Sequence, residues 1–385
     1  MHYASYYNNL EALTLLYESH FVDVNDTDNS GCTALHAGVK CNETVELLLT
    51  FNFNPTSKDD QDRYPLHYAL IGGHADTFLT LINHVIQNNL SNFSVNDLDK
   101  KGHSLLHYCS KTNLKECLHV LLELGIDVTR KDTFSHNFLH FAANFGSFSL
   151  MDELFQNTRK HRLSSLITSA NVYGQKPLHF AGARGNGETC EYLIDKKAPS
   201  WAPDKFGCTA LHYASFFANF DAIHVLLKQR DLQRTDKFGA KPIHFAALGG
   251  KLNLIKELIS NGGNIHDPDH QGRTAIFYAG NESTLQFLHS QGLDIFSMDK
   301  KKRSILFTSI QLGTFLLPPS SFPSFPFLPY FPFPSLSLFP ASFSPSPFSL
   351  PLSFPSPSPL FLFLLPRFPL HFENAYIPFS FPLFL

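Results

Sequence analysis

Histidine is the residue type in this sequence whose recurrence points most directly to chemistry. It stands in near copies of one short motif, as in TALHYAS (209–215), KPLHFAG (176–182) and KPIHFAA (241–247). Seven histidines share this setting: His36, His67, His107, His140, His179, His212 and His244. Imidazole groups bind metal ions and transfer protons near neutral pH, so the series could form a metal or acid–base site. The alternative is that these histidines are structural.

The spacing of the histidines favours the structural interpretation. Successive members are 31, 40, 33, 39, 33 and 32 residues apart. The motif extends backward to His2, and forward with phenylalanine in the histidine position at Phe277 and Phe307. About ten units of about 33 residues indicate a repeat architecture. Consecutive histidines then lie one repeat apart, too far to share a ligand, so we expect no metal site and no catalytic residues among them.

Each unit carries signals for a turn followed by two short helices. An Asp-x-x-Gly turn such as Asp204 to Gly207 precedes the motif, and these residue types suit tight turns. A capping side chain such as Thr209 stands three residues before the histidine, or a proline such as Pro177 takes the first helical position. A second apolar helix follows, as in DAIHVLLKQR (221–230). One such pair cannot bury its own apolar face, so the units must stack.

This pattern, D-x-x-G-x-T-P-L-H-x-A-A, resembles the ankyrin repeat over roughly residues 1–313. The resemblance implies an all-α ankyrin solenoid of about ten units, the first and last incomplete. In that family the threonine and histidine of the motif hydrogen-bond at the helix start and tie neighbouring repeats together. The role carries over to the pairs Thr33/His36 and Thr209/His212, and in part to Ser104/His107. For His67, His179 and His244, which lack the hydroxyl, only the helix-start position carries over, and Phe277 and Phe307 indicate degenerate repeats.

The resemblance also implies a non-catalytic scaffold or adaptor that binds another protein. Ankyrin arrays expose turn tips and the face of the first helix with the short turn after it, and exposed aromatic residues are frequent interface anchors. The candidate partner-binding residues in such places are Phe134, Phe145, Trp201, Phe206, Phe216, Phe217 and Phe238. We expect Phe206, Phe216, Phe217 and Phe238 to form one exposed apolar patch. The alternative is that they are scattered surface residues, some packed against the adjacent repeat.

Two further features concern packing. The residue after each motif histidine is aromatic, and we interpret this stripe as packing between first helices: Tyr3, Tyr68, Tyr108, Phe141, Phe180, Tyr213 and Phe245, with Tyr278 after Phe277. The segments 83–96 and 156–169 carry six or seven extra residues each. Insertions in a solenoid are expected to form loops on one side of the array.

Composition and missing motifs restrict the remaining function classes. A net charge of −3 argues against a nucleic-acid binder. The six cysteines have irregular spacing with no C-x-x-C pair, which favours reduced thiols in the cytoplasm or nucleus. Residues 1–313 lack phosphate-binding, zinc-protease and hydrolase motifs, so we expect no enzyme activity, cofactor or small-molecule substrate there.

A second interpretation is that these repeats are the regulatory part of a larger enzyme or channel whose other domain is missing. The stretch VNDLDKKGHSLLHY (95–108) is also similar to part of the ankyrin regulatory subunits of protein phosphatase 6, which implies phosphatase regulation. The chain begins inside a repeat motif, and we expect it to be a fragment.

The last 72 residues, 314–385, form a low-complexity tail. Of these, 62 are Pro, Phe, Ser or Leu. Recurrent proline excludes long helices and interior strands, and no proline-free apolar run reaches the roughly 20 residues of a membrane span. We expect either a disordered segment offering polyproline ligands, or a pyrimidine-rich non-coding stretch translated as protein, because all four residues have codons written with C and T alone.

Overall fold

The computed structural model describes residues 1–311, apart from residues 21, 158, 159, 185 and 230. The chain divides into two compact bodies, Met1–Leu316 and Leu317–Leu385. The described residues all belong to the first body. The tail expected at 314–385 and its boundary at residue 313 lie outside the described residues.

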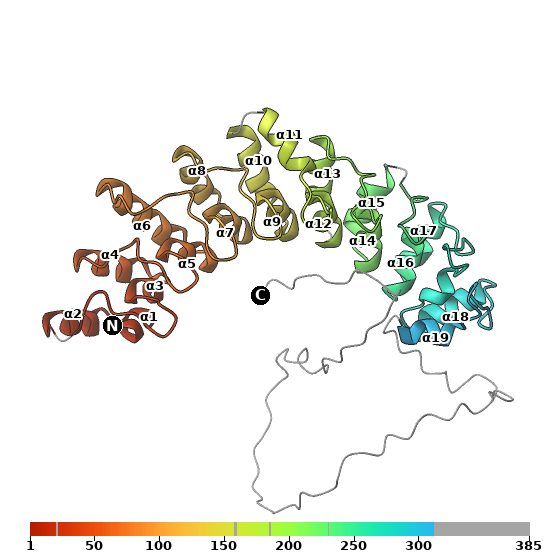
Figure 1. Ribbon diagram of the computed structural model, residues 1–385, viewed down its shortest axis with the longest axis horizontal. Helices are drawn as coiled ribbons and strands as arrows, with labels where there is room; N and C mark the ends of the chain where they lie inside the picture. Colours follow the sequence, from red (N-terminus) through yellow and green to blue (C-terminus); the bar gives the residue numbers. More distant parts are fainter. Residues whose placement is uncertain (21, 158–159, 185, 230, 312–385) are drawn as a thin grey trace, which may run out of the picture. The chain divides into compact units, whose positions relative to one another are not determined.

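The described residues form helix pairs that follow one another along the chain, which we number as units 1 to 10 (Figure 1). No strand longer than an isolated bridge occurs in this part of the chain. The first helices are α1 (His2–Tyr6), α3 (Ala34–Gly38), α5 (Pro65–Gly72), α7 (Leu105–Thr112), α9 (Phe138–Phe145), α12 (Pro177–Arg184), α14 (Ala210–Phe217), α16 (Pro242–Leu248), the 3₁₀ turn η1 (Ala275–Tyr278) and α19 (Ile305–Gln311). The second helices of units 1 to 9 are α2 (Leu10–Glu18), α4 (Asn42–Thr50), α6 (Ala75–Gln87), α8 (Lys115–Glu123), α10 (Phe148–Asn157), α13 (Gly187–Asp195), α15 (Phe220–Leu227), α17 (Leu252–Ser260) and α18 (Glu282–Ser290).

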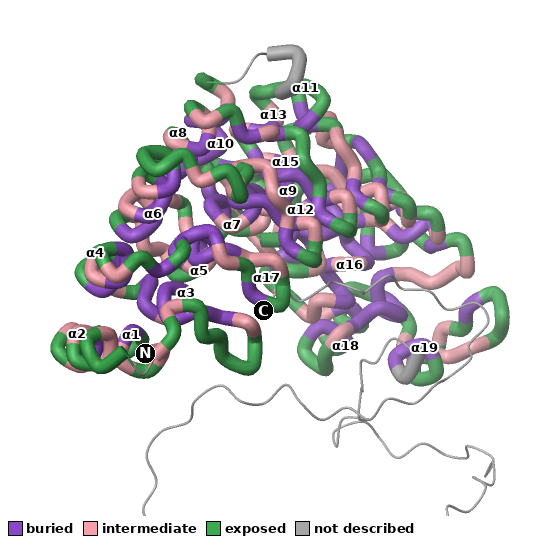
Figure 2. The backbone as a smooth tube through the Cα atoms, turned by 60° about the vertical axis from the view of Figure 1, so that its left-hand side comes forward, coloured by how far each residue is buried: buried purple, intermediate pink, exposed green. Residues whose placement is uncertain are grey.

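Successive units stack through both rows of helices. First helices contact first helices, as α12 does α14, and second helices contact second helices, as α13 does α15. One apolar core therefore runs from Leu13 in unit 1 to Ile305 in unit 10. Figure 2 shows the buried stretches continuing from one unit to the next. The stacking buries the apolar face that a single helix pair leaves exposed, as a solenoid requires.

Turns of fixed geometry set the register between units. In unit 7 the Oδ1 of Asp204 accepts hydrogen bonds from the backbone N–H groups of Phe206 (2.8 Å) and Cys208 (2.9 Å). Gly207 has a φ of 87°, and a Cβ there would lie 2.5 Å from the backbone nitrogen of Lys237 in the next turn. Glycine is required because the chain is left-handed at a point of close backbone approach. The contacts between neighbouring turns thereby position each first helix beside the first helix of the next unit.

The predicted loops in the two long units are wrong in part. The segment 83–96 begins inside α6, which runs for 13 residues, and only its second half is a turn. The segment 156–169 contains an additional helix, α11 (Lys160–Thr168). Leu166 and Ile167 of α11 are buried in the core, so burial of apolar residues stabilises a helix where a polar loop was expected.

Unit 9 departs from the other units. Its first helix is a single 3₁₀ turn, η1, with Phe277 in the histidine position and buried. A phenylalanine ring cannot accept a hydrogen bond from the backbone of the capping residue, so one interaction that holds the first turn of units 2 to 8 is missing.

Candidate functional site

Each motif histidine caps its own helix through one ring nitrogen. The Nδ1 of His36 accepts a hydrogen bond from the backbone N–H of Thr33 (3.0 Å) and lies 2.9 Å from its hydroxyl. The same backbone bond reaches His67, His107, His140, His179, His212 and His244 over 2.9–3.1 Å. His67, His179 and His244 make it without a hydroxyl partner, because only the backbone N–H is required.

The other ring nitrogen ties one unit to the next. Because Nδ1 accepts a backbone N–H, the neutral ring carries its proton on Nε2 and donates there. In unit 7 the Nε2 of His212 lies 3.2 Å from the carbonyl oxygen of Ala240 in unit 8. Equivalent bonds run from His2 to Cys32, His36 to Arg63, His107 to His136, His140 to Gln175, His179 to Cys208 and His244 to Asp267, over 2.8–3.2 Å. The Nε2 of His67 is buried without a hydrogen-bond partner among the described residues.

Burial keeps these histidines neutral. It lowers the pKa of His67 and His107 to about 4, and that of His140 and His212 to about 3. Within residues 1–311, where described, no group of three or more histidine, cysteine or carboxylate side chains could hold a metal ion. Apart from His67, the motif histidines have both ring nitrogens bonded within the fold, so these side chains link neighbouring repeats.

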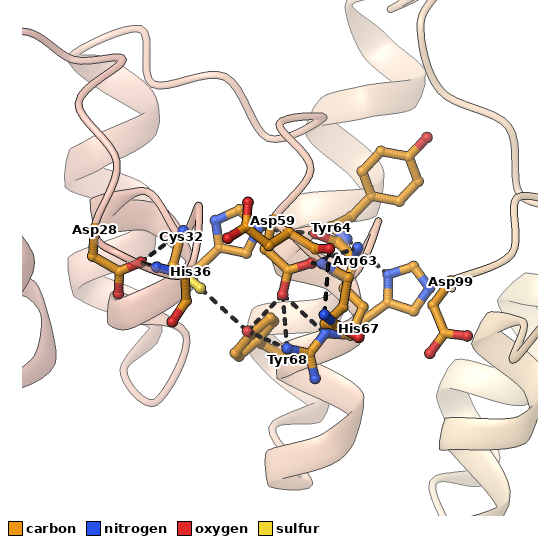
Figure 3. Close-up of polar contacts among 12 residues, drawn as sticks. Asp28, Cys32, His36, Asp59, Arg63, Tyr64, His67, Tyr68 and Asp99 are labelled. Atoms are coloured by element: carbon orange, nitrogen blue, oxygen red, sulfur yellow. Dashed lines mark hydrogen bonds and ion pairs between the residues drawn. The ribbon is translucent and has the colours of Figure 1, made fainter. Parts of the chain in front are cut away.

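The aromatic stripe adds contacts within each turn and between neighbouring units. The tyrosine hydroxyls donate to the aspartate of their own turn, at 2.8 Å from Tyr68 to Asp59 and 2.6 Å from Tyr213 to Asp204. The Tyr68 ring stands edge-on to His36 of the preceding unit, with ring centroids 5.3 Å apart. Figure 3 shows this joint between units 2 and 3, where Arg63 also contacts Asp59. Tyr3, the first residue of the stripe, is exposed.

The four phenylalanines expected to form one patch fall into two separate pairs. Phe206 and Phe238 lie in neighbouring turn tips, joined where the N–H of Lys237 donates to the Phe206 carbonyl (2.9 Å). Phe216 and Phe217 end α14, with ring centroids 4.9 Å apart. The eight residues of α14 separate the pairs by roughly 12 Å of helix. Only Phe217 is exposed, and Phe216 packs against the core, so the single exposed patch is corrected to two pairs.

The other three candidate residues are exposed. Trp201 is 56% exposed in the turn before α14, and Phe134 is 37% exposed in the turn before α9. Phe145, the last residue of α9, is also 37% exposed. Phe145 and Phe217 occupy the same place in units 5 and 7, at the ends of their first helices.

The exposed phenylalanines outside the predicted set include two that occupy equivalent places in units 5 and 7. Phe148 and Phe220 begin α10 and α15, three residues after Phe145 and Phe217, and are 37% and 38% exposed. We call Phe145, Phe148, Phe217 and Phe220 the Phe rim. The sequence could have indicated the Phe rim, because F-x-x-F recurs at 145–148 and 217–220. Each segment spans the turn between the first and second helix of its unit.

Unit 6 lies between the two halves of the Phe rim. Its helices α12 and α13 contact those of units 5 and 7. Arg184 ends α12, in the place of Phe145 and Phe217, and its Nε donates to Asn144 of unit 5 (2.9 Å). Gly187 begins α13 and has no side chain that could cover the rim. The Phe148 ring stands edge-on to Tyr192 of α13 at 4.9 Å, which fixes that half of the rim to unit 6. The rim is thus held by three stacked units.

Comparisons with known proteins agree with this architecture. A family model described as ankyrin repeats in three copies matches residues 1–92, 41–132, 139–236 and 219–299. The human transient receptor potential cation channel subfamily A member 1 is 25% identical over 324 residues, which cover 81% of this chain and 28% of the channel. Dog inversin is 30% identical over 173 residues, covering 44% of this chain and 16% of inversin. The chain therefore spans less than a third of the length of these relatives.

Among solved structures, the chain is similar to the ankyrin repeat domain of Bcl-3, with 21% identity and a TM-score of 0.47, covering 59% of this chain and 98% of that domain. The helices of the described residues include none long and apolar enough to cross a membrane. The family matches take in most of the array of stacked helix pairs, and this chain belongs to the ankyrin repeat family.

Proposed function

We propose that this chain is a non-catalytic scaffold or adaptor that binds a protein partner on the Phe rim. Ankyrin repeats are protein-interaction modules. The observation that carries the proposal is the pair of F-x-x-F segments in units 5 and 7. They expose four aromatic rings at equivalent places on one array. Aromatic residues are enriched at interface cores and among hot spots, because a few rings bury much apolar area at low entropic cost.

The spacing of the rim suits a partner with two apolar contact points. Packed helices lie 8–10 Å apart, so units 5 and 7 are separated by roughly 20 Å. Arg184 stands between them and offers a positive charge to that partner. The turn-tip pair Phe206 and Phe238, with Trp201, gives a second contact area in this proposal.

The test compares the partners retained by matched variants. The double variant Phe145→Ser/Phe217→Ser removes one ring from each half of the rim. Phe134→Ser removes an equally exposed ring that the sequence also suggested for binding but that lies outside the rim, at the other end of α9. Quantitative affinity capture from cells should show specific partners that are lost with the rim variant and kept with the control. Retention of every partner by the rim variant would reject the Phe rim as the binding surface.

A second candidate is that the array is the ankyrin region of a larger channel or enzyme. The match over 324 residues to a cation channel favours it, since the array covers only 28% of that protein. Long-read sequencing of transcripts across the codons for residues 1 and 313 would test it, because this candidate requires splicing into a further domain. Phosphatase regulation stays a prediction, tested by co-purification with a phosphatase catalytic subunit.

A further inference from the structure

In five units, one position of the turn supplies the side chain that pairs with the turn aspartate. It lies directly before the capping residue, four residues after the aspartate. Units 3, 9 and 10 place an arginine there, and its guanidinium binds the aspartate of the same turn: Arg63 with Asp59 (2.7 Å), Arg273 with Asp269 (2.6 Å) and Arg303 with Asp299 (2.6 Å). Units 4 and 5 place His103 and His136 there instead. A permanent cation is thus replaced by a titratable group in two consecutive units.

His103 lies between the carboxylates of two units. Its Nδ1 is 3.4 Å from the Oδ2 of Asp99 in its own turn, and its Nε2 is 3.6 Å from the Oδ2 of Asp132 in the turn of unit 5. All three side chains are buried. The hydroxyl of Tyr108 also donates to Asp99, at 2.5 Å. The imidazole ring therefore spans the joint between units 4 and 5 with a carboxylate at each end.

The neighbouring His136 has an amide group at one ring nitrogen and a carboxylate at the other. Asn171 of unit 6 has its Oδ1 engaged by the backbone N–H groups of Tyr173 and Gln175, both at 2.9 Å, so its amide group points toward His136. That amide lies 3.0 Å from the Nε2 of His136, which must accept. The Nδ1–H of His136 then donates to Asp132 at 2.9 Å. His103 is the ring with acidic oxygen atoms on both sides.

We propose that His103 is a proton-dependent link between units 4 and 5, so that the coupling of these units weakens as pH rises above neutrality. The protonated ring directs one N–H toward Asp99 and the other toward Asp132, and forms an ion pair with each. A neutral ring has one N–H, so it presents a lone pair to the other carboxylate. Removing one partner of a buried charged group is costly, and the joint loosens in consequence.

The electrostatic environment favours the protonated form. Burial opposes the charge on His103, but the carboxylates of Asp132 and Asp99 outweigh it and raise its pKa above the ordinary 6.5. Burial likewise opposes the charge on Asp99, yet His103 and Tyr108 lower the pKa of Asp99 to about 2. The titratable and charged groups around the ring are His107 and Tyr108 on α7, Asp132 and His136 in the next turn, and Asp59, Arg63 and His67 in the preceding unit. Burial keeps His67 and His107 neutral, with pKa values of about 4.

The sign of the effect follows from the raised pKa. Stability from His103 is fully present below its unfolded-state value and is lost as pH rises through the folded-state value. The motif histidines have lowered pKa values and titrate below 6.5, so they contribute nothing to a change above that pH. A change in stability above pH 6.5 is therefore attributed to His103 and not to the motif histidines.

The experiment measures amide hydrogen exchange of the full chain by mass spectrometry at pH 6.5 and 8.5, corrected for intrinsic rates. Because the closed joint binds the His103 proton more tightly than the open one, peptides of units 4 and 5 should lose protection severalfold at pH 8.5. His103→Arg, which copies units 3, 9 and 10, should keep protection at both pH values. His103→Gln should show low protection at both. An equal pH-dependent loss in wild type and both variants would overturn the proposal.

A direct titration covers the case in which neither variant folds. Deuterium exchange at the imidazole C2 position reports the pKa of each histidine by peptide in the unaltered protein. For His103 we expect a value above 6.5 and above those of His107 and His140. A value at or below 6.5 would overturn the proposal.

Discussion

The Nε2 of His212 in unit 7 lies 3.2 Å from the backbone carbonyl oxygen of Ala240 in unit 8. The same imidazole accepts the backbone N–H of Thr209 at its other nitrogen, 3.1 Å away. One buried side chain therefore caps its own helix and fixes the position of the next turn. Since equivalent bonds recur along the array, the stacking that positions the Phe rim depends on them.

Replacing His212 by alanine should destabilise the array by roughly 2–4 kcal/mol, because the Thr209 N–H and the Ala240 carbonyl lose their partner in a buried site. Urea denaturation followed by circular dichroism measures the effect. His266→Ala is the matched control, since His266 is exposed and its change should stay within about 0.5 kcal/mol. Equal effects of the two substitutions would contradict the linking role of His212.

Acidification should destabilise the whole array. Burial lowers the folded-state pKa of His67 and His107 to about 4, so the unfolded chain takes up these protons first as pH falls below 6.5. Their stabilisation is present above 6.5 and is lost as pH falls toward 4. The urea midpoint should drop clearly between pH 7 and pH 5. A midpoint unchanged over this range would mean that these rings are not neutral and buried in solution.

Unit 8 offers a stabilising substitution. Its turn aspartate, Asp236, has Ala240 where units 3, 9 and 10 have arginine, and burial raises the pKa of Asp236 to about 6. Ala240→Arg combined with Phe245→Tyr copies the Asp269, Arg273 and Tyr278 cluster of unit 9. We expect a gain of about 1–2 kcal/mol at pH 7, measured as a rise in urea midpoint.

The control for this substitution is Ala240→Met with Phe245→Tyr, which adds similar volume without the charge. It should give no gain. A gain from the methionine variant equal to that from the arginine variant would show that packing, and not neutralisation of Asp236, is responsible.

The Phe rim should be dispensable for folding. Phe217 and Phe220 are each more than a third exposed, so Phe217→Ser/Phe220→Ser should cost under about 1 kcal/mol. Phe138→Ser, at a buried position of α9, should cost about 3–5 kcal/mol by comparison. Thermal melts of the three proteins separate these outcomes. A large loss of melting temperature in the rim variant would place those rings in the core.

The repeat pattern was predictable because it depends on local signals. The turn aspartates, the capping residues and the histidines recur at a fixed period, and the sequence alone indicates an all-α ankyrin solenoid confirmed by the family match. The neutral, bonded state of His212 follows from the same periodicity, since its two partners are set by position and not by side-chain type.

Burial of individual side chains was not predictable in the same way. Phe216 and Phe217 are adjacent in sequence, yet one packs against the core and the other is exposed, because successive residues point to different sides of a helix. The approach of Asp132 to His103 also depends on how two turns stack, 29 residues apart. The helix α11 was missed since an insertion length says nothing about whether residues such as Leu166 reach the core.

The most direct test of the proposed function is photocrosslinking from single sites in the intact protein. A benzophenone-bearing phenylalanine analogue at position 145, 217 or 134 samples the two halves of the Phe rim and the turn tip of unit 5. We expect positions 145 and 217 to crosslink to the same partner protein and position 134 to give no crosslink to it. Crosslinking of a partner from position 134 alone, with none from the Phe rim, would contradict binding on the rim.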